Sequence, residues 1–281
     1  MYKIVTKREI ASKIKLFEVS APEVARKAKP GQFVILRMDE KGERIPITIA
    51  NFEAAEGTVT IVFNEVGKTT KKLGLLNEGD CIQDLTGPLG NPSEIKKHGQ
   101  VLCVGGGVMI APLYLQALAL RKEGNELITV IGARTEDLLI FEKEMKEISD
   151  EFYIATDDGS KGHQGLNFLK DLLNNRKVDR VIVMGPVVMM KTVAEITRPY
   201  SLHTVVTLTP IMVDGMGMCG ACRVSVGGET KFACMDGPEF DGHLVDFDQL
   251  IKRQRMYLPE ERLSSMIHEK LGGFSYVKAK A

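Results

Sequence analysis

One short segment near the C-terminal end carries the residue types and the spacing that iron–sulfur chemistry requires. Asp214 is followed by Cys219 and then Cys222, with four and two residues between them, and Cys234 lies further along the chain. This is the ligand pattern of a plant-type [2Fe–2S] loop, with a carboxylate in place of the first thiolate. Glycines within the segment let the backbone fold tightly and bring its N–H groups toward inorganic sulfide. The pattern predicts a metal site, formed by these four residues, that carries single electrons.

A structural zinc site is the alternative interpretation of the same segment. Zinc accepts sulfur and oxygen ligands in a tetrahedron, and three cysteines and one aspartate could supply them. Zinc knuckles usually present two pairs of closely spaced ligands, whereas here one Cys-x2-Cys pair stands against the lone Cys234. The spacing therefore favours iron and sulfide over a zinc-stabilised nucleotide-binding protein without enzymatic activity.

The composition excludes several classes of function. The 281 residues include 37 Lys and Arg and 37 Asp and Glu, so nothing indicates a nucleic-acid or strongly anionic membrane partner. The N-terminal residues show no apolar signal region, and no window approaches the roughly 20 apolar residues needed to cross a bilayer. Three of the five cysteines lie in one loop, which suits a reducing compartment. We expect a cytoplasmic protein in which Cys81 and Cys103 are buried packing residues.

The hydrophobic pattern divides the chain into three parts. Residues 1–97 alternate with the two-residue period of strands, which predicts a small antiparallel β barrel. Residues 98–209 alternate between short apolar strands and helical stretches, which predicts an α/β domain with a parallel sheet covered on both faces. Residues 210–281 contain the cysteine loop, a hairpin near 223–234 and helices near 246–256 and 259–271, which predicts a small C-terminal [2Fe–2S] domain with a helical tail.

Polar and glycine-rich loops follow the strands of the middle part, where parallel sheets bind their ligands. The strands are expected at 101–104, 127–131, 152–155, 180–184 and 203–208, and the helices at 112–123, 137–148, 165–175 and 187–197. The first strand ends in three glycines that precede a helix, and a helix N-terminus favours a phosphate. The next three strands end in an arginine, two aspartates and a Gly-Pro turn. The candidate dinucleotide residues are Gly105, Gly106, Gly107, Arg134, Asp157, Asp158, Gly185 and Pro186.

A second phosphate-binding segment is expected in the barrel part. Gly67, Lys68, Thr69 and Thr70 open a possible short helix that ends near Leu75. The backbone amides and hydroxyl groups of this turn could hold a pyrophosphate. An ordinary helix N-cap formed by either threonine is the alternative.

The order of these motifs resembles the ferredoxin reductase-like electron-transfer subunits. The resemblance covers essentially all of residues 1 to 250 and rests on Ile45-Pro46-Ile47-Thr48, on the Gly67 turn, on a Gly-Gly-Gly-x-x-x-Ala-Pro segment and on the cysteine loop. There are two departures from the family pattern. Ile45 stands where the family usually has an arginine directly before the proline, with Arg44 one place earlier, and Met109 stands where a glycine is common.

The resemblance implies three cofactors, namely FAD, NAD(H) and a [2Fe–2S] cluster. It places the flavin ring on Pro46, Ile47 and Thr48, the flavin and its ribityl chain along Val62, Phe63 and Asn64, and the pyrophosphate at Gly67, Thr69 and Thr70. It places NAD(H) across the strand-end loops, with the nicotinamide near the flavin. The cofactors carry the reaction in such proteins, so no catalytic side chain is assigned.

Two branches of this family fit the motifs. The small subunit of NADH-dependent reduced ferredoxin:NADP oxidoreductase is favoured, because that branch has an aspartate at the first ligand position. The electron-transfer subunit of dihydroorotate dehydrogenase is the alternative and usually has four cysteines. The first branch implies a larger flavin and iron–sulfur partner subunit, exchange with ferredoxin and electron bifurcation. Arg134 is compatible with a 2′-phosphate, so the sequence leaves open whether this subunit prefers NAD or NADP.

Overall fold

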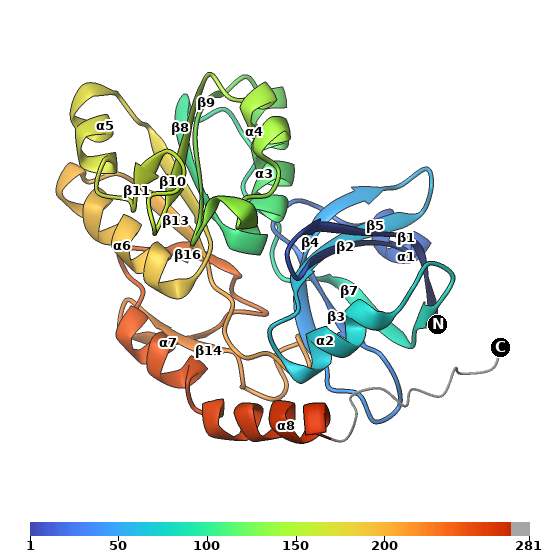
Figure 1. Cartoon of the computed structure of the whole chain (residues 1–281). Coiled ribbons are helices and arrows are strands. Elements are labelled where there is room, and N and C mark those ends of the chain that lie inside the picture. Colours follow the sequence, from blue (N-terminus) through green and yellow to red (C-terminus); the bar gives the residue numbers. More distant parts are fainter. Residues whose placement is uncertain (271–281) are drawn as a thin grey trace.

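The computed structural model describes residues 1–270, in which a barrel, a nucleotide-type domain and a C-terminal segment follow one another (Figure 1). Seven strands of the described chain form a nearly closed antiparallel barrel in the order β6-β1-β2-β5-β4-β3-β7. Its elements are β1 (Tyr2–Ala11), β2 (Ile14–Ser20), α1 (Pro22–Ala25), β3 (Phe33–Arg37), β4 (Ile45–Glu53), β5 (Thr58–Asn64), α2 (Lys68–Leu75), β6 (Cys81–Ile82) and β7 (Asp84–Leu89). The antiparallel barrel expected from the two-residue period is confirmed.

The alternation of side chains along the barrel strands decides which residues fill its interior. Ile47 on β4 and Phe63 on β5 point inward, and the Phe63 ring packs edge to face against Phe17 with centroids 5.1 Å apart. Their neighbours Thr48 and Val62 point to the opposite face, because successive side chains on a strand alternate. That outer face is the one the following domain covers.

A mainly parallel sheet follows the barrel, in the order β11-β10-β9-β8-β12-β13-β16. Its elements are β8 (Gln100–Gly106), η1 (Gly107–Met109), α3 (Ile110–Lys122), β9 (Glu126–Ala133), η2 (Glu136–Leu138), α4 (Glu142–Ile148), β10 (Glu151–Thr156), β11 (His163–Gln164), α5 (Leu169–Asn175), β12 (Arg180–Met184), α6 (Val187–Thr197), η3 (Arg198–Tyr200) and β13 (Thr204–Thr207). The last strand, β16 (Glu239–Asp241), comes from the C-terminal segment and pairs antiparallel with β13. The predicted parallel sheet is confirmed, with two strands added to the five expected, namely β11 and β16.

Helices cover both faces of the sheet, as expected. Helices α3 and α4 pack on one face, and α5 and α6 pack on the other. The predicted helix 137–148 is wrong in its first turn, because Phe141 has a left-handed φ of 56° and the α-helix begins only at Glu142. The predicted helix 165–175 begins later too, since Gly165 has a φ of 65° and its N–H donates to the carbonyl of Thr156.

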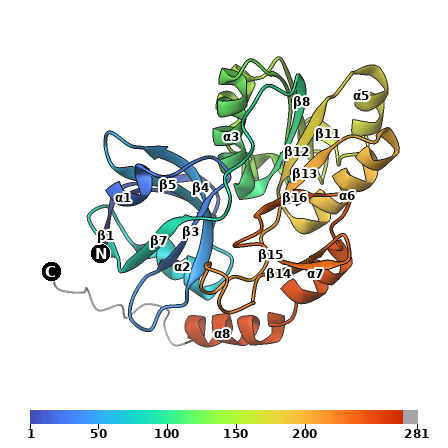
Figure 2. The same cartoon turned by 180° about the vertical axis from the view of Figure 1, so that it is seen from behind.

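The C-terminal segment returns to the barrel after leaving the sheet. It contains β14 (Arg223–Val226), β15 (Glu229–Phe232), β16, α7 (Phe247–Gln254) and α8 (Leu258–Lys270). Viewed from behind, β14 and β15 lie beside α7, below the sheet domain (Figure 2). Apolar residues of the C-terminal segment and of the barrel strand β3 share one core, which contains Phe33, Ile35, Met212, Cys222, Ala233 and Cys234. Residue 271, the expected last residue of the final helix, lies outside the described part of the chain.

The two cysteines outside the loop have different environments. Cys103 is fully buried, as predicted, and burial raises the pKa of its thiol to about 12. The prediction for Cys81 is wrong, because this residue is exposed. It lies on the two-residue edge strand β6, where Ile82 turns inward and Cys81 turns outward. Across residues 1–270, no helix combines the length and the apolar character that a membrane span requires.

Candidate cofactor and electron-transfer site

The four predicted metal ligands form two close pairs, with Asp214, Cys219 and Cys222 on one loop and Cys234 shortly after β15. The Asp214 Oδ1 and Cys219 Sγ atoms are 3.2 Å apart, and the Cys222 and Cys234 Sγ atoms are also 3.2 Å apart. Among the described residues, no three His, Cys, Asp or Glu side chains converge on a single ion position. A [2Fe–2S] cluster requires no such group, because each of its two irons takes two protein ligands beside the bridging sulfides. The donor set thus fits a two-iron cluster better than one zinc ion.

Asp214 also organises the loop through its backbone. Its carboxylate accepts hydrogen bonds from the N–H groups of Met216 (3.3 Å), Met218 (2.8 Å) and Cys219 (3.0 Å). Burial alone would raise the pKa of Asp214, but the hydrogen bonds from the Cys219 thiol and from these amides together lower it. An anionic carboxylate can therefore serve as a ligand and as the acceptor that closes the turn.

The two pairs differ in exposure. Cys222 and Cys234 are both 2% exposed, whereas Cys219 is exposed. Burial and the hydrogen bond with Cys222 raise the pKa of the Cys234 thiol to about 12. Such a thiol keeps its proton at neutral pH until a metal cation replaces it. One end of the ligand set is therefore in the protein interior, and the other end is at the surface.

The loop is attached directly to the barrel. The Arg44 Nε–H donates to the Val213 carbonyl oxygen (2.9 Å), one residue before the first predicted ligand. Gly215 has a φ of 74°, and a Cβ at this position would lie 2.8 Å from Ile35 and from Leu89 of the barrel. Only a glycine allows this close approach in a left-handed conformation. Both contacts hold the predicted metal ligands close to β3, β4 and β7.

The predicted flavin residues lie side by side on β4 and β5. Ile49 pairs with Ile61 at the end of the β4–β5 ladder, and the segments 46–48 and 62–64 continue from that same end. Ile47 and Phe63 belong to the barrel core, so their side chains are directed away from the outer face. Thr48 lies on that face, and its hydroxyl approaches the Met109 Sδ at 4.0 Å. The methionine that replaces the family glycine thus contacts the predicted flavin surface from the nucleotide domain.

The predicted pyrophosphate turn is the N-terminus of α2. The Gly67 N–H donates to the Thr70 Oγ1 (3.1 Å), so Thr70 caps the helix. The Thr69 hydroxyl donates to the Glu43 carboxylate, and the Lys68 Nζ lies 3.5 Å from the same group. A carboxylate already occupies the helix N-terminus, which is the place where the partial charge of a helix favours an anion. No sequence spacing indicated Glu43, because it acts from a neighbouring loop.

The glycines at the strand ends of the nucleotide domain have two different roles. A Cβ on Gly105 would lie 2.8 Å from Leu113, and a Cβ on Gly106 or Gly185 would overlap Met189. These three glycines are therefore required by packing at the strand ends. Gly107 has a φ of 57°, and a Cβ there would meet no described atom within 4 Å. Its backbone at the start of η1 is open to a ligand.

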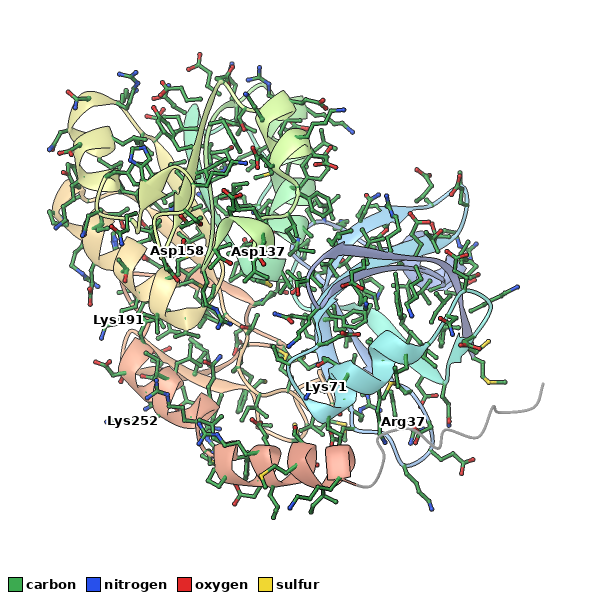
Figure 3. All side chains as sticks on the ribbon, viewed as in Figure 1. Arg37, Lys71, Asp137, Asp158, Lys191 and Lys252 are labelled. Carbon is green, nitrogen blue, oxygen red and sulfur yellow. The ribbon has the colours of Figure 1, made fainter. Side chains whose placement is uncertain are left out.

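The loops after β9 and β10 form one connected rim. The Asp158 N–H donates to the Arg134 carbonyl (3.2 Å), and the Glu136 N–H donates to the Ser160 Oγ (2.9 Å). Figure 3 shows Asp137 and Asp158 at this rim. The Ser160 hydroxyl and N–H both donate to the Asp158 carboxylate and lower its pKa. The structure thus brings Arg134, Asp157 and Asp158 together, while Pro186 begins the turn into α6.

A barrel, a parallel nucleotide-type sheet and a two-pair ligand loop together define a ferredoxin reductase-like electron-transfer protein. The phthalate dioxygenase reductase structure has the same fold, with a TM-score of 0.59 at 19% identity, covering 80% of this chain and 85% of that one. Residues 209–246 match the model of the iron–sulfur cluster binding domain of dihydroorotate dehydrogenase B. This match includes all four predicted ligands and supports the iron–sulfur interpretation.

Similarity over the full length then identifies the family. A Thermotoga maritima protein described as a homologue of the dihydroorotate dehydrogenase B (NAD(+)) electron transfer subunit is 51% identical over 263 residues, covering 93% of each chain. A chain of the NADH-dependent reduced ferredoxin–NADP oxidoreductase structure, reported for flavin-based electron bifurcation, is 48% identical with a TM-score of 0.90, covering 96% and 98%. The chain belongs to the family of dihydroorotate dehydrogenase B electron-transfer subunits and their homologues. The predicted cofactor set of FAD, a [2Fe–2S] cluster and NAD(H) is confirmed at the level of this family.

Proposed function

We propose that this chain is the electron-transfer subunit of an NADH-dependent reduced ferredoxin:NADP oxidoreductase that bifurcates electrons. It would exchange electrons between NAD(H) and a larger flavin and iron–sulfur subunit. The observation that carries the proposal is the likeness to a chain of that enzyme along almost the whole of both chains. The pairing of Asp214 with Cys219 supports it independently, because the proposed branch has an aspartate at the first ligand position.

Each cofactor would be held by residues that the fold brings together. FAD would lie on the outer face of β4 and β5 at Pro46, Thr48, Val62 and Asn64 and on the backbone of Ile47 and Phe63, with its pyrophosphate at Gly67, Thr69 and Thr70. NAD(H) would lie across Gly105, Gly106, Gly107, Arg134, Asp157, Asp158, Gly185 and Pro186. The cluster would be held by Asp214 and Cys219 on one iron and by Cys222 and Cys234 on the other. When bound, a flavin takes up a hydride and releases electrons singly, and the cluster carries them onward.

The task of the protein is to orient these groups and exclude water from them. Helix α3 packs against β4, which brings the glycine loop at its N-terminus toward the predicted flavin face. Met109 and Val108 are apolar and lie with Val62 in the core between the two domains. The Arg44 contact and the Gly215 packing fix the ligand loop to the barrel beside the start of β4, where Ile35 pairs with Pro46. The proposed flavin residues would thus have the nucleotide loops and the ligand loop as neighbours, an arrangement that suits electron transfer between the two.

Dihydroorotate oxidation is the second candidate function. The observation in its favour is the 51% identical relative, which is described as a homologue of the electron transfer subunit of dihydroorotate dehydrogenase B. In that case the same cofactor sites would serve a pyrimidine-oxidising partner. The two functions differ in the partner subunit, since the chain itself would work in the same way in both.

Co-purification from the native source distinguishes the two functions. The chain would be isolated anaerobically with its bound partner, and iron, acid-labile sulfide and flavin would be measured. We expect NADP reduction that depends on both NADH and reduced ferredoxin. Orotate formation from dihydroorotate would establish the second function instead. A preparation of the chain with neither iron nor labile sulfide would refute both.

A further inference from the structure

Two arginines bind the backbone of the turn that separates two of the predicted cluster ligands. The Arg223 Nη1 donates to the Gly220 carbonyl oxygen (3.0 Å), and the Arg253 Nη2 donates to the Ala221 carbonyl oxygen (3.2 Å). Gly220 and Ala221 are the two spacer residues of the Cys-x2-Cys segment. Each of the two spacer carbonyl groups is therefore hydrogen-bonded to a guanidinium group.

One of these peptide units also reaches a ligand sulfur. The carbonyl and the N–H of a trans peptide unit point in opposite directions, because the unit is planar. The unit that joins Gly220 to Ala221 accepts Arg223 at its carbonyl, and its N–H donates to the Cys219 Sγ (3.5 Å). A chain of hydrogen bonds thus runs from a guanidinium group through one peptide unit to the sulfur. Such bonds polarise one another, so the charge of Arg223 strengthens the donor that faces Cys219.

The second arginine belongs to a helix that is anchored elsewhere in the molecule. Helix α7 packs beside α6 and beside β14 (Figure 1). Its Phe247 and Leu250 are buried in the core that α6 also lines. The Lys191 Nζ of α6 lies 2.8 Å from the Asp248 carboxylate of α7. The backbone position of Arg253 is therefore set by contacts with the sheet domain and with β14.

The last turn of α7 contacts the ligand-bearing segment on both sides of Asp214. The Gln254 Nε2 donates to the Thr209 carbonyl oxygen (2.9 Å), before Asp214 in the chain, and Arg253 binds the Ala221 carbonyl after it. Two adjacent side chains at the end of one helix thus hold two separate points of the segment. A basic side chain also suits this place, because a helix C-terminus favours a cation.

The positive charges of the two arginines are not neutralised by carboxylates. In the described part of the chain, neither Arg223 nor Arg253 forms an ion pair. Reduction adds one electron to an iron–sulfur cluster, and a fixed positive charge nearby favours the reduced form. Net charge and hydrogen bonds to the sulfurs are among the factors that set the reduction potential. Both factors act in the same direction at this turn.

We propose that Arg223 and Arg253 are positioning residues that hold the turn between Cys219 and Cys222 and raise the reduction potential of the cluster bound there. They act through the backbone carbonyls of the turn and are not ligands themselves. The inference rests on the proposed function for the presence of the cluster, whereas the hydrogen bonds depend only on residues of this chain. It does not depend on which partner subunit the chain serves.

The test measures the reduction potential of the cluster in the full, cofactor-loaded chain by potentiometry with EPR detection. Arg223→Met and Arg253→Met remove the charge and the donors, whereas a lysine at either position keeps the charge. At a fixed electrode potential, each methionine variant should lower the ratio of reduced to oxidised cluster about three- to tenfold, and tenfold is 59 mV for a one-electron couple. The lysine variants should recover most of this loss. Arg255→Met, which removes the same charge from the exposed C-cap of α7, is the control and should change the ratio by less than about twofold.

Unchanged potentials in both methionine variants would overturn the proposal, as would an equal shift in Arg255→Met. Iron and labile sulfide are measured in the same samples, so that a shifted potential is assigned to an intact cluster. Should a methionine variant not assemble the cluster, Arg223→Gln and Arg253→Gln decide the question, because glutamine keeps an N–H donor and loses the charge. These variants should lower the ratio in the same direction.

Hydrogen exchange of the segment 219–222 provides a measurement that does not depend on iron. Exchange should be about two- to tenfold faster in the methionine variants than in the wild type and in Arg255→Met, because each loses one hydrogen bond to the turn. Equal exchange in all of them would show that the arginines do not hold the turn. A wild-type chain without iron would refute the proposed function, whereas the exchange data would still decide whether the turn is held.

Discussion

At the scale of single residues, Asp214 has two possible roles that substitutions can separate. Its carboxylate lies beside Cys219 and also accepts three backbone N–H groups of the loop. A ligand to iron at this position is expected to be a thiolate or an ionised carboxylate. An acceptor for backbone amides needs only an oxygen atom. Asparagine keeps the acceptor and loses the charge, while cysteine keeps an anionic ligand and loses the hydrogen bonds.

We therefore expect Asp214→Cys to retain a cluster with a changed absorption spectrum and reduction potential, because ligand type and charge set both. Asp214→Asn should lose iron. Iron content, visible spectra and redox titration of the two variants provide the measurement. If Asp214→Asn kept the wild-type spectrum and potential, Asp214 would be a loop residue and not a ligand.

Functional residues that lie close together in the sequence were predictable from their spacing. Residues whose partners are far away in the sequence were not. The cysteine loop was found from four positions in one segment, since local spacing reflects local geometry. Glu43 and Arg253 were missed because each meets its partner across a long stretch of chain, at Thr69 and at Ala221. Nothing in the neighbouring sequence marks either side chain.

At the scale of elements, the charge at the N-terminus of helix α2 should affect the affinity of the barrel for the FAD pyrophosphate. The Glu43 carboxylate lies at the N-terminus of α2, where a pyrophosphate is proposed. An anion near a helix N-terminus is worth about 0.3–1 kcal/mol. Glu43→Gln should therefore lower the dissociation constant for FAD by about two- to fivefold. Fluorescence titration of the flavin-free protein with FAD measures this dissociation constant, and Glu40→Gln in the same loop is the control. A weaker or equal affinity would contradict the placement of the pyrophosphate.

Most elements of the sheet domain were predictable because strand and helix periods differ, and β12 and α6 have the expected bounds. The short strand β11 was not expected, and the larger errors in the helices fall at the starts of α4 and α5. There, Phe141 and Gly165 adopt positive φ values that the apolar pattern does not reveal. The pattern reports which face is buried, whereas a helix start depends on the backbone conformation of one residue. The pairing of β16 with β13 was likewise not predictable, since its three residues resemble a loop.

At the scale of the whole molecule, Gly215 tests the contact between the ligand loop and the barrel. An alanine there would have both a left-handed backbone and a Cβ 2.8 Å from Ile35 and from Leu89. Gly228 has a similar φ of 81°, and a Cβ there would meet no described atom within 4 Å. The left-handed backbone should lower the free energy of unfolding by about 1–2 kcal/mol in each alanine variant. The steric overlap should lower it by about 1–3 kcal/mol more in Gly215→Ala only.

Urea unfolding of Gly215→Ala and Gly228→Ala, followed by circular dichroism, measures this difference. We expect the first variant to be clearly less stable than the second and to lose its visible absorption at a lower urea concentration. Equal stability of the two variants would show that the loop moves away from the barrel without cost.

The strand β16 has a consequence for how this protein could be divided. A chain cut after residue 209 would contain every parallel strand of the sheet, yet one side of β13 would present unpaired backbone N–H and C=O groups to solvent. Exposed strands of this kind recruit other chains and promote aggregation. We expect residues 98–209, expressed alone, to self-associate in size-exclusion chromatography, and residues 98–245 to remain monomeric. The predicted boundary at 209 would then separate two sequence patterns without being a place where the polypeptide can be divided.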